Sequence, residues 1–287
     1  MNPNEFMLES ALSFERDEKF LHALQIYRRL LSDENLRKKA ALRVAVVYDK
    51  LNKSKEATIF LADYCSENPE DIEIVKYLAS RFIYDRQYQN AVDLLNLQDG
   101  NENPEISFLR GYADYYLGEF ETAKKNLTEF VQSGSRGDLL FDAFLHLAKS
   151  DLNLGLIDEA FEAVEKAEKF DSENGDALFV KAKIFYIWQM YRHAYEAIKK
   201  AQLADEGNPK YLKLLAKVLF KIGDYQKAGN YLMNLCSMNC GDEEIFALLG
   251  FVRLKENDKA GAEKHFKAAL AFNSDYDYAK EGLKRCK

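Results

Sequence analysis

The chain has 287 residues, of which 47% are apolar and 30% charged, a soluble composition with ample material for a core. Its formal net charge of −7 argues against nucleic acid as the main partner, because lysine and arginine make the contacts to a phosphate backbone. No stretch approaches the roughly 18 consecutive apolar residues of a transmembrane helix, so we expect no membrane span.

The first residues, MNPNEFMLESALSFERDEKF, contain no basic segment followed by an apolar one, so they do not resemble a secretion signal. The four cysteines, Cys65, Cys236, Cys240 and Cys286, are too few and too scattered for a disulfide framework. Both observations favour a reducing, cytoplasmic location. With 4 prolines and 14 glycines, the chain has few helix breakers, which favours long helices over many short strands.

A pair of small residues twelve positions apart recurs eight times along the chain. Successive pairs are 34 residues apart, except for steps of 32 and 37 on either side of the fourth pair. In chain order the pairs are Ala11 and Ala23, Ala45 and Ala57, Ala79 and Ala91, Gly111 and Ala123, Ala148 and Ala160, Ala182 and Ala194, Ala216 and Ala228, and Gly250 and Ala262. A large apolar residue follows each second member by four positions: Tyr27, Leu61, Leu95, Leu127, Val164, Ile198, Leu232 and Phe266.

Each pair predicts two antiparallel helices joined by a tight turn. Alanine lets the helices approach closely without the penalty of glycine in a helix, about 1 kcal/mol. Residues that tolerate the left-handed conformation at a helix end stand at one equivalent position between the pair members: Asn52, Gly118, Gly155, Gly223 and Asn257. Asn-Pro steps, such as Asn68-Pro69 and Asn208-Pro209, mark helix stops and restarts between repeats.

The last repeat, IFALLGFVRLKENDKAGAEKHFKAALAFNS, resembles the tetratricopeptide repeat, a 34-residue helix–turn–helix unit. The matching positions are Phe246, Leu249, Gly250, Ala262, Phe266 and Ala269. The resemblance implies an all-α, right-handed superhelical solenoid of eight repeats at residues 4–37, 38–71, 72–103, 104–137, 141–174, 175–208, 209–242 and 243–274. Residues 275–287 are expected to form a mostly polar C-terminal capping helix.

Several positions depart from the family pattern. Arg110 and Lys181 occupy positions where the family prefers leucine, and Asp114, Asp151 and Arg253 occupy positions where it prefers an aromatic residue. The longer of the two irregular steps contains QSGSRGD, residues 132–138, which predicts a flexible loop. We expect the superhelix to kink or loosen there without dividing into independent domains.

The sequence contains no pattern that predicts catalysis or a bound cofactor. Cys236 and Cys240 could share a metal ion, but a structural zinc site needs four ligands, so packing cysteines are the better interpretation. The four histidines fall in different repeats, outside any metal-binding motif. We therefore expect no metal, no cofactor and no enzymatic activity.

In the family that the chain resembles, the first helices of the repeats line a concave surface that binds protein. The residues carried over to this surface are the aromatic Phe108, Tyr112, Tyr115, Phe179, Tyr186, Phe220 and Phe251, and the basic Lys149, Lys183, Lys213 and Lys217. Aromatic side chains anchor a peptide at little entropic cost, and lysines select acidic flanks. The prediction is a scaffold or adaptor whose partner is an acidic, hydrophobic protein or peptide segment.

Three alternatives to this interpretation stay open. Several of these aromatic residues could instead pack between neighbouring helices. The chain could be a structural scaffold that forms homo-oligomers through its terminal repeats, since Phe6, Met7, Leu8 and Leu12 crowd the first helix. It could also be a chaperone for a hydrophobic secreted client, similar to the much shorter repeat chaperones of secretion systems.

Overall fold

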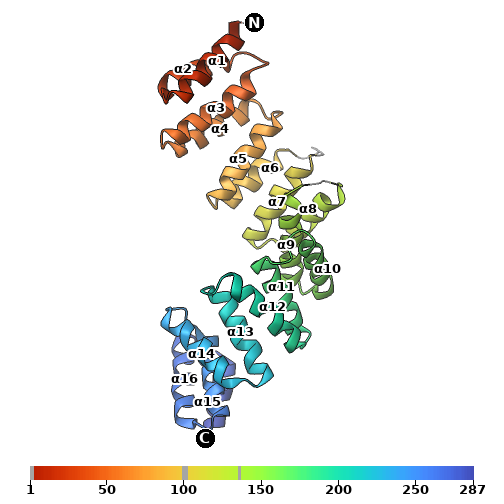
Figure 1. The fold of residues 1–287 in the computed structure, drawn as a ribbon, viewed down its shortest axis with the longest axis vertical. Coiled ribbons are helices and arrows are strands. Elements are labelled where there is room, and N and C mark those ends of the chain that lie inside the picture. Colours follow the sequence, from red (N-terminus) through yellow and green to blue (C-terminus); the bar gives the residue numbers. More distant parts are fainter. Residues whose placement is uncertain (1–2, 99–102, 135–136) are drawn as a thin grey trace. The chain divides into compact units, whose positions relative to one another are not determined.

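The structure, a computed structural model, describes residues 3–98, 103–134 and 137–287 (Figure 1). Across these residues the regular secondary structure consists of seventeen α-helices, without a β-strand. This result confirms the predicted all-α fold with two helices per repeat and one helix after the last repeat.

The residues group into two compact units, Met1–Arg136 and Gly137–Lys287. The boundary falls within the loop predicted at residues 132–138, of which residues 135–136 lie outside the described part of the chain. The expectation of a continuous superhelix across this loop stays a prediction.

Each repeat in the N-terminal unit forms one pair of helices. They are α1 (Pro3–Arg16), α2 (Phe20–Leu30), α3 (Arg37–Lys50), α4 (Ser54–Glu67), α5 (Ile72–Tyr84), α6 (Tyr88–Asn96), α7 (Pro104–Leu117) and α8 (Phe120–Gln132). The C-terminal unit continues the pattern with α9 (Leu139–Asn153), α10 (Ile157–Glu168), α11 (Gly175–Ile187), α12 (Tyr191–Ala204), α13 (Pro209–Ile222), α14 (Tyr225–Ser237), α15 (Glu243–Lys255), α16 (Lys259–Phe272) and α17 (Asp277–Cys286).

The small residues lie where the two helices of each repeat touch. All members of the eight pairs are buried, and so are the eight large apolar residues that follow them. The lack of space at this contact is clearest at Gly250, where a Cβ atom would lie only 2.5 Å from Cε1 of the Phe266 ring. Gly111 faces Leu127 in the same way, with 2.8 Å from its would-be Cβ to the Leu127 Cγ. The recurring small residue is thus required by close helix packing, as predicted.

The turn inside each repeat uses one left-handed residue. Asn52, Gly118, Gly155, Gly223 and Asn257 all have positive φ, between 57° and 98°, which confirms the predicted turn position. The same position in the other three repeats is also left-handed, although it holds Glu18, Arg86 and Gln189, with φ of 59°, 59° and 62°. The geometry of the helix pair therefore imposes this conformation even on residues that do not favour it.

The last helix closes the C-terminal end of the core. In α17, Ala279 and Gly282 are buried against α15 and α16. A Cβ atom on Gly282 would lie 2.3 Å from the Phe266 ring, so Phe266 lies between two glycines, Gly250 and Gly282. The predicted cap is present, and its packing face is closely fitted to the final repeat.

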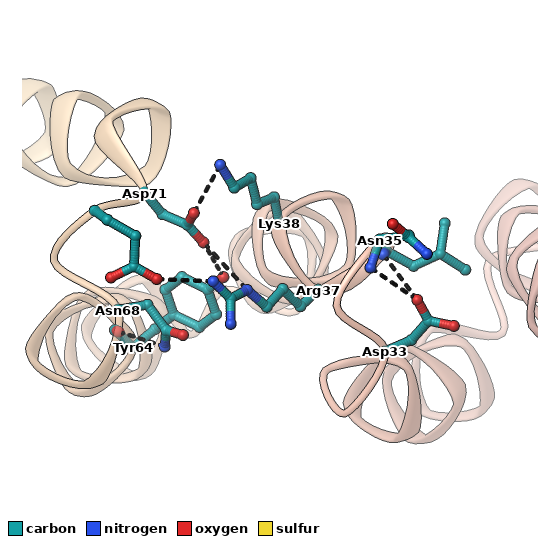
Figure 2. A network of polar contacts seen from close by, with 9 residues as sticks. Asp33, Asn35, Arg37, Lys38, Tyr64, Asn68 and Asp71 are labelled. Carbon is teal, nitrogen blue, oxygen red and sulfur yellow. Dashed lines mark hydrogen bonds and ion pairs between the residues drawn. The ribbon is translucent and has the colours of Figure 1, made fainter.

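A buried carboxylate joins three helices of the N-terminal unit (Figure 2). Asp71, just before α5, is 1% exposed and accepts a hydrogen bond of 2.5 Å from the hydroxyl of Tyr64 in α4. Lys38 Nζ in α3 lies 2.7 Å from the other carboxylate oxygen, Oδ1, and Arg37 Nε lies 3.7 Å from Oδ2, the oxygen that accepts from Tyr64. Burial alone would raise the pKa of Asp71, but the hydrogen bonds from Lys38 and Tyr64, with the charges of Lys38 and Arg37, lower it below its ordinary value.

Candidate functional site

Two of the predicted surface aromatics are instead part of the core. Phe108 is 5% exposed and packs against Phe130, with ring centroids 5.2 Å apart. Phe251 is 6% exposed and is covered by Phe266 and by Tyr278, whose ring centroid lies 4.3 Å away. The prediction that these two face a client is wrong, because neighbouring helices occupy the space in front of them, as the packing alternative foresaw.

Three other predicted residues come together in one cleft of the C-terminal unit. Tyr186 from α11 and Lys217 and Phe220 from α13 line a cleft of about 240 Å³. The wall is completed by Lys221 from α13, by Glu244 and Leu248 from α15, and by Tyr276, just before α17, and Tyr278 in its first turn. The two tyrosines belong to the segment predicted to be a polar cap, so sequence reasoning missed their place in this cleft.

Most of the predicted lysines are already paired with acidic side chains at the end of their own repeat or in the next one. Lys149 Nζ lies 2.9 Å from Asp176, and Lys217 Nζ lies 2.6 Å from Glu244. Lys213 Nζ contacts both Asp242, at 2.7 Å, and Glu244, at 2.6 Å. Although burial would raise the pKa of Glu244, the hydrogen bonds and charges of Lys213 and Lys217 lower it, so this carboxylate is ionised at neutral pH.

Lys183 differs from these lysines because, among the residues that the structure describes, the charged groups that act on it are lysines and no acid is paired with it. Its Nζ lies over the ring of Phe179, 5.8 Å from the centroid. Desolvation by the neighbouring residues lowers the pKa of Lys183, and the positive charges of Lys217 and Lys210 lower it further. The local field is therefore positive, and an anionic group placed here would stabilise the charged ammonium.

The aromatic side chains around the cleft are partly engaged with one another. Phe179 lies 5.3 Å from Tyr211, Tyr186 lies 5.7 Å from Tyr191, and Phe220 lies 5.3 Å from Tyr225, all between ring centroids. Each of Phe179, Tyr186 and Phe220 is half-buried. They are thus held in place by packing and still present one surface to solvent.

Two acidic side chains of the first helices in the N-terminal unit, Glu15 and Asp49, are likewise paired. The buried Glu15 accepts hydrogen bonds from the Tyr27 hydroxyl, at 2.8 Å, and from Lys50, at 2.9 Å. Asp49 is bound by both terminal nitrogens of Arg81, at 2.5 and 3.0 Å. The predicted Tyr112 lines a separate recess of this unit, and Tyr115 packs edge-on against Tyr116, with ring centroids 5.2 Å apart.

No group of three or more His, Cys, Asp or Glu side chains in the described residues is arranged to hold a metal ion. Cys236 and Cys240 are thiols that are each half-buried, and burial raises the pKa of Cys236. No described helix combines the length and the apolar character that a bilayer crossing requires.

Comparison with known proteins gives the fold a wider context. The family described as subunit 3 of the anaphase-promoting complex, or cyclosome, matches residues 153–235. No curated protein sequence matches the chain.

Among solved structures, the chain resembles one from the Cut9–Hcn1 hetero-tetramer of the anaphase-promoting complex, with a TM-score of 0.67 at 14% identity. That match covers 100% of this chain but 57% of the other. PilF of Pseudomonas aeruginosa matches with a TM-score of 0.62 at 12% identity, over 74% of this chain and 96% of its own. YrrB, described as a TPR protein with an unusual peptide-binding site, matches with a TM-score of 0.53 at 15% identity, over 66% of this chain and 96% of its own. At these identities the likeness shows the fold alone.

Proposed function

Because the chain has the tetratricopeptide repeat fold, we propose that it is a non-catalytic scaffold that binds a protein segment with acidic and apolar side chains. The segment lies in the cleft formed by α11, α13, α15 and the start of α17. YrrB, a protein of the same fold, is described as having a peptide-binding site, which supports a peptide as the type of ligand.

The observation that carries this proposal is a group of aromatic rings around one cleft with lysines beside them. Tyr186, Phe220, Tyr276 and Tyr278 supply the rings. Such rings bury large apolar areas with few rotatable bonds, which is the property of residues that dominate binding energy. An isolated aromatic on a surface would not require a partner, but several rings around one recess form an anchor site.

The charge of the cleft favours an acidic partner. Lys183 has no ion pair among the described residues, and Lys213 and Lys217 share one carboxylate, Glu244. A carboxylate of the partner would gain by pairing with Lys183 directly and by replacing Glu244 beside Lys217. The attraction would steer association, so it would depend on salt concentration.

A pair of synthetic peptides tests the proposal. One peptide alternates Asp or Glu with Leu or Phe, and its control carries Lys at every acidic position. The full chain should bind the acidic peptide, measured by fluorescence anisotropy, and should not bind the control. Equal binding of both peptides would contradict the assigned charge preference.

Charge variants of the protein locate the site. Lys183→Glu should slow association of the acidic peptide and reduce its salt dependence, whereas Lys200→Glu, an exposed reversal on α12, should change neither. Glu244→Gln should strengthen binding, because it frees Lys217 from its ion pair, while Lys213 stays paired with Asp242. A Glu244→Gln protein that binds more weakly would show that the partner does not replace this carboxylate.

The aromatic contribution is measured separately. Tyr186→Ala should speed dissociation of the acidic peptide by an amount equivalent to about 2 kcal/mol if the ring is an anchor. If neither Tyr186→Ala nor Lys183→Glu alters the affinity, the binding surface is elsewhere on the chain.

A further inference from the structure

The N-terminal unit contains a second recess with a different character. It has a volume of about 680 Å³ and is lined by Ser80, Ile83, Tyr84, Arg86, Tyr88, Tyr112 and Tyr116. These residues come from the end of α5, the turn that follows it, the first residue of α6, and α7. We call this surface the tyrosine recess.

The rings of the tyrosine recess form a supported wall. Tyr88 and Tyr116 are stacked almost parallel, with centroids 4.8 Å apart and planes 9° apart. Tyr112 lies 5.0 Å from Tyr116, and its hydroxyl donates to the Tyr116 hydroxyl at 3.4 Å. Tyr115 packs edge-on against Tyr116. The wall is therefore held in place before any ligand arrives.

Tyr84 is the exposed element of this recess. Its side chain is 87% exposed, the highest value among the exposed large apolar residues of the described chain. Folding gains little from a ring left in water, because the hydrophobic free energy scales with the area that is buried. The ring is available to a ligand that packs between it and the wall.

The recess is nearly neutral, which sets it apart from the cleft of the C-terminal unit. Among its lining residues one, Arg86, carries a charge. The neighbouring Arg81 is neutralised by its two contacts to Asp49 and also donates to the Ser54 hydroxyl, at 2.9 Å. A strongly acidic segment would find few positive charges here to pair with, and a basic segment would find few negative ones.

A proline-rich segment fits these properties. In the polyproline II conformation the backbone makes no internal hydrogen bonds, proline contributes no N–H, and the carbonyl groups point outward as acceptors. Tyrosine supplies a flat ring for the pyrrolidine ring and a hydroxyl that can donate to a carbonyl. Aromatic-lined grooves are one of the general ways in which proteins bind such segments.

Two other modes of peptide binding suit the recess less well. Adding a strand needs the exposed edge of a β-sheet, and the described residues form helices without a strand. An amphipathic helix needs a continuous apolar groove, whereas Ile83 is the one aliphatic residue that lines this recess. We propose that the tyrosine recess binds an uncharged, proline-rich segment in the polyproline II conformation.

Fluorescence anisotropy with a labelled oligoproline peptide and the full chain tests this proposal. The control peptide has the same length and charge, with Gly and Ser in place of alternate prolines, so that it loses the preformed conformation. We expect saturable binding of oligoproline and at least roughly tenfold weaker binding of the control, because the control must be ordered on binding. Absence of saturable oligoproline binding, or equal binding of both peptides, would overturn the proposal.

Variants assign the binding to this recess. Tyr84→Ala should weaken oligoproline binding about tenfold, and Tyr84→Phe should weaken it less, because the ring is kept. Leu203→Ala, at an exposed apolar residue of α12 in the C-terminal unit, is the control and should leave oligoproline binding unchanged. Since Tyr84 is so exposed, its removal should not disturb folding, which circular dichroism verifies.

The acidic peptide separates this proposal from the proposed function. The Tyr84→Ala protein should bind the acidic peptide as the parent does. An excess of the acidic peptide should not displace oligoproline from the parent protein. Unchanged oligoproline affinity in Tyr84→Ala, or mutual displacement of the two peptides, would contradict a separate proline-binding site whatever the acidic peptide does on its own.

Discussion

Replacing Gly250 with alanine should destabilise the C-terminal unit, although alanine is the better helix former. The new Cβ would lie 2.5, 2.7 and 2.8 Å from three atoms of the Phe266 ring. The ring has no room to move toward α17, because it already lies against Gly282 on its other side. A Cβ atom on Gly282 would be only 2.3 Å from the ring. Either the ring or one of the two helices must move.

The size of the effect follows from two opposing quantities. Overpacking a core costs about 1–3 kcal/mol, and the confined ring favours the upper half of that range. Against this cost, alanine stabilises the helix by about 1 kcal/mol relative to glycine. We therefore expect a net loss of about 1–2 kcal/mol in the free energy of unfolding, or about 2–8 °C in Tm for a unit of this size.

Urea denaturation monitored by the fluorescence of Trp188 measures this change, because Trp188 is the single tryptophan and lies in the C-terminal unit. Gly229→Ala is the matched control: its Cβ would meet one atom, Val252 Cγ1, at 3.3 Å, so it should cost at least about 1 kcal/mol less. A Gly250→Ala protein as stable as the parent would refute the reasoning.

A second substitution checks the mechanism. Other repeats place alanine against leucine at the equivalent contact, as in Ala216 with Leu232, and both are fully buried. Combining Gly250→Ala with Phe266→Leu should therefore cost less than the sum of the two single changes, by about 1 kcal/mol or more. Simple additivity would show that the two residues do not oppose each other.

Three further predictions concern stability. Burial, followed by the charge of Lys149, lowers the pKa of His146 from 6.5 to about 4, so the unfolded chain binds a proton more readily between these values. Stability should therefore fall by about 2 kcal/mol between pH 7 and pH 5, and His146→Phe should remove this part of the pH dependence in urea denaturation. Gln189→Gly should raise the free energy of unfolding by about 0.5–1 kcal/mol, because glycine relieves the left-handed strain at φ 62°; a lower Tm would contradict this. Asp71→Asn should cost about 1–3 kcal/mol at pH 7, and the difference from the parent should shrink as the pH falls below 3.8, since the lowered pKa of Asp71 stabilises the folded state only while the carboxylate is charged.

The repeat architecture could be predicted because its cause is local and recurs at a fixed spacing. A small residue faces a large one where two helices touch, and both must keep their size for the helices to fit. The left-handed turns at Glu18, Arg86 and Gln189 escaped notice, because the chain geometry sets that conformation and the residue identity does not reveal it. Counting seven positions from each first small residue would have found them.

The candidate site was predicted only in part, because position on a helix face does not reveal what a neighbouring helix covers. Tyr186, Lys217 and Phe220 do meet in one cleft, whereas Phe108 and Phe251 are buried by other rings. The pairing of the lysines could have been predicted, since each acid follows its lysine by 27 to 31 residues, slightly less than one repeat. The place of Tyr276 and Tyr278 in the cleft could not be predicted in this way, because both residues follow the last repeat.

The ion pairs between successive repeats make those repeats non-interchangeable. Lys149 of the fifth repeat faces Asp176 of the sixth, whereas the residue equivalent to Asp176 in the seventh repeat is Lys210. Excising residues 175–208 would leave every small–large contact of the pattern in register and yet would set Lys149 against Lys210. Modular engineering of this chain, by deleting, duplicating or exchanging repeats, therefore has to carry the acid of one repeat together with the lysine of the repeat before it.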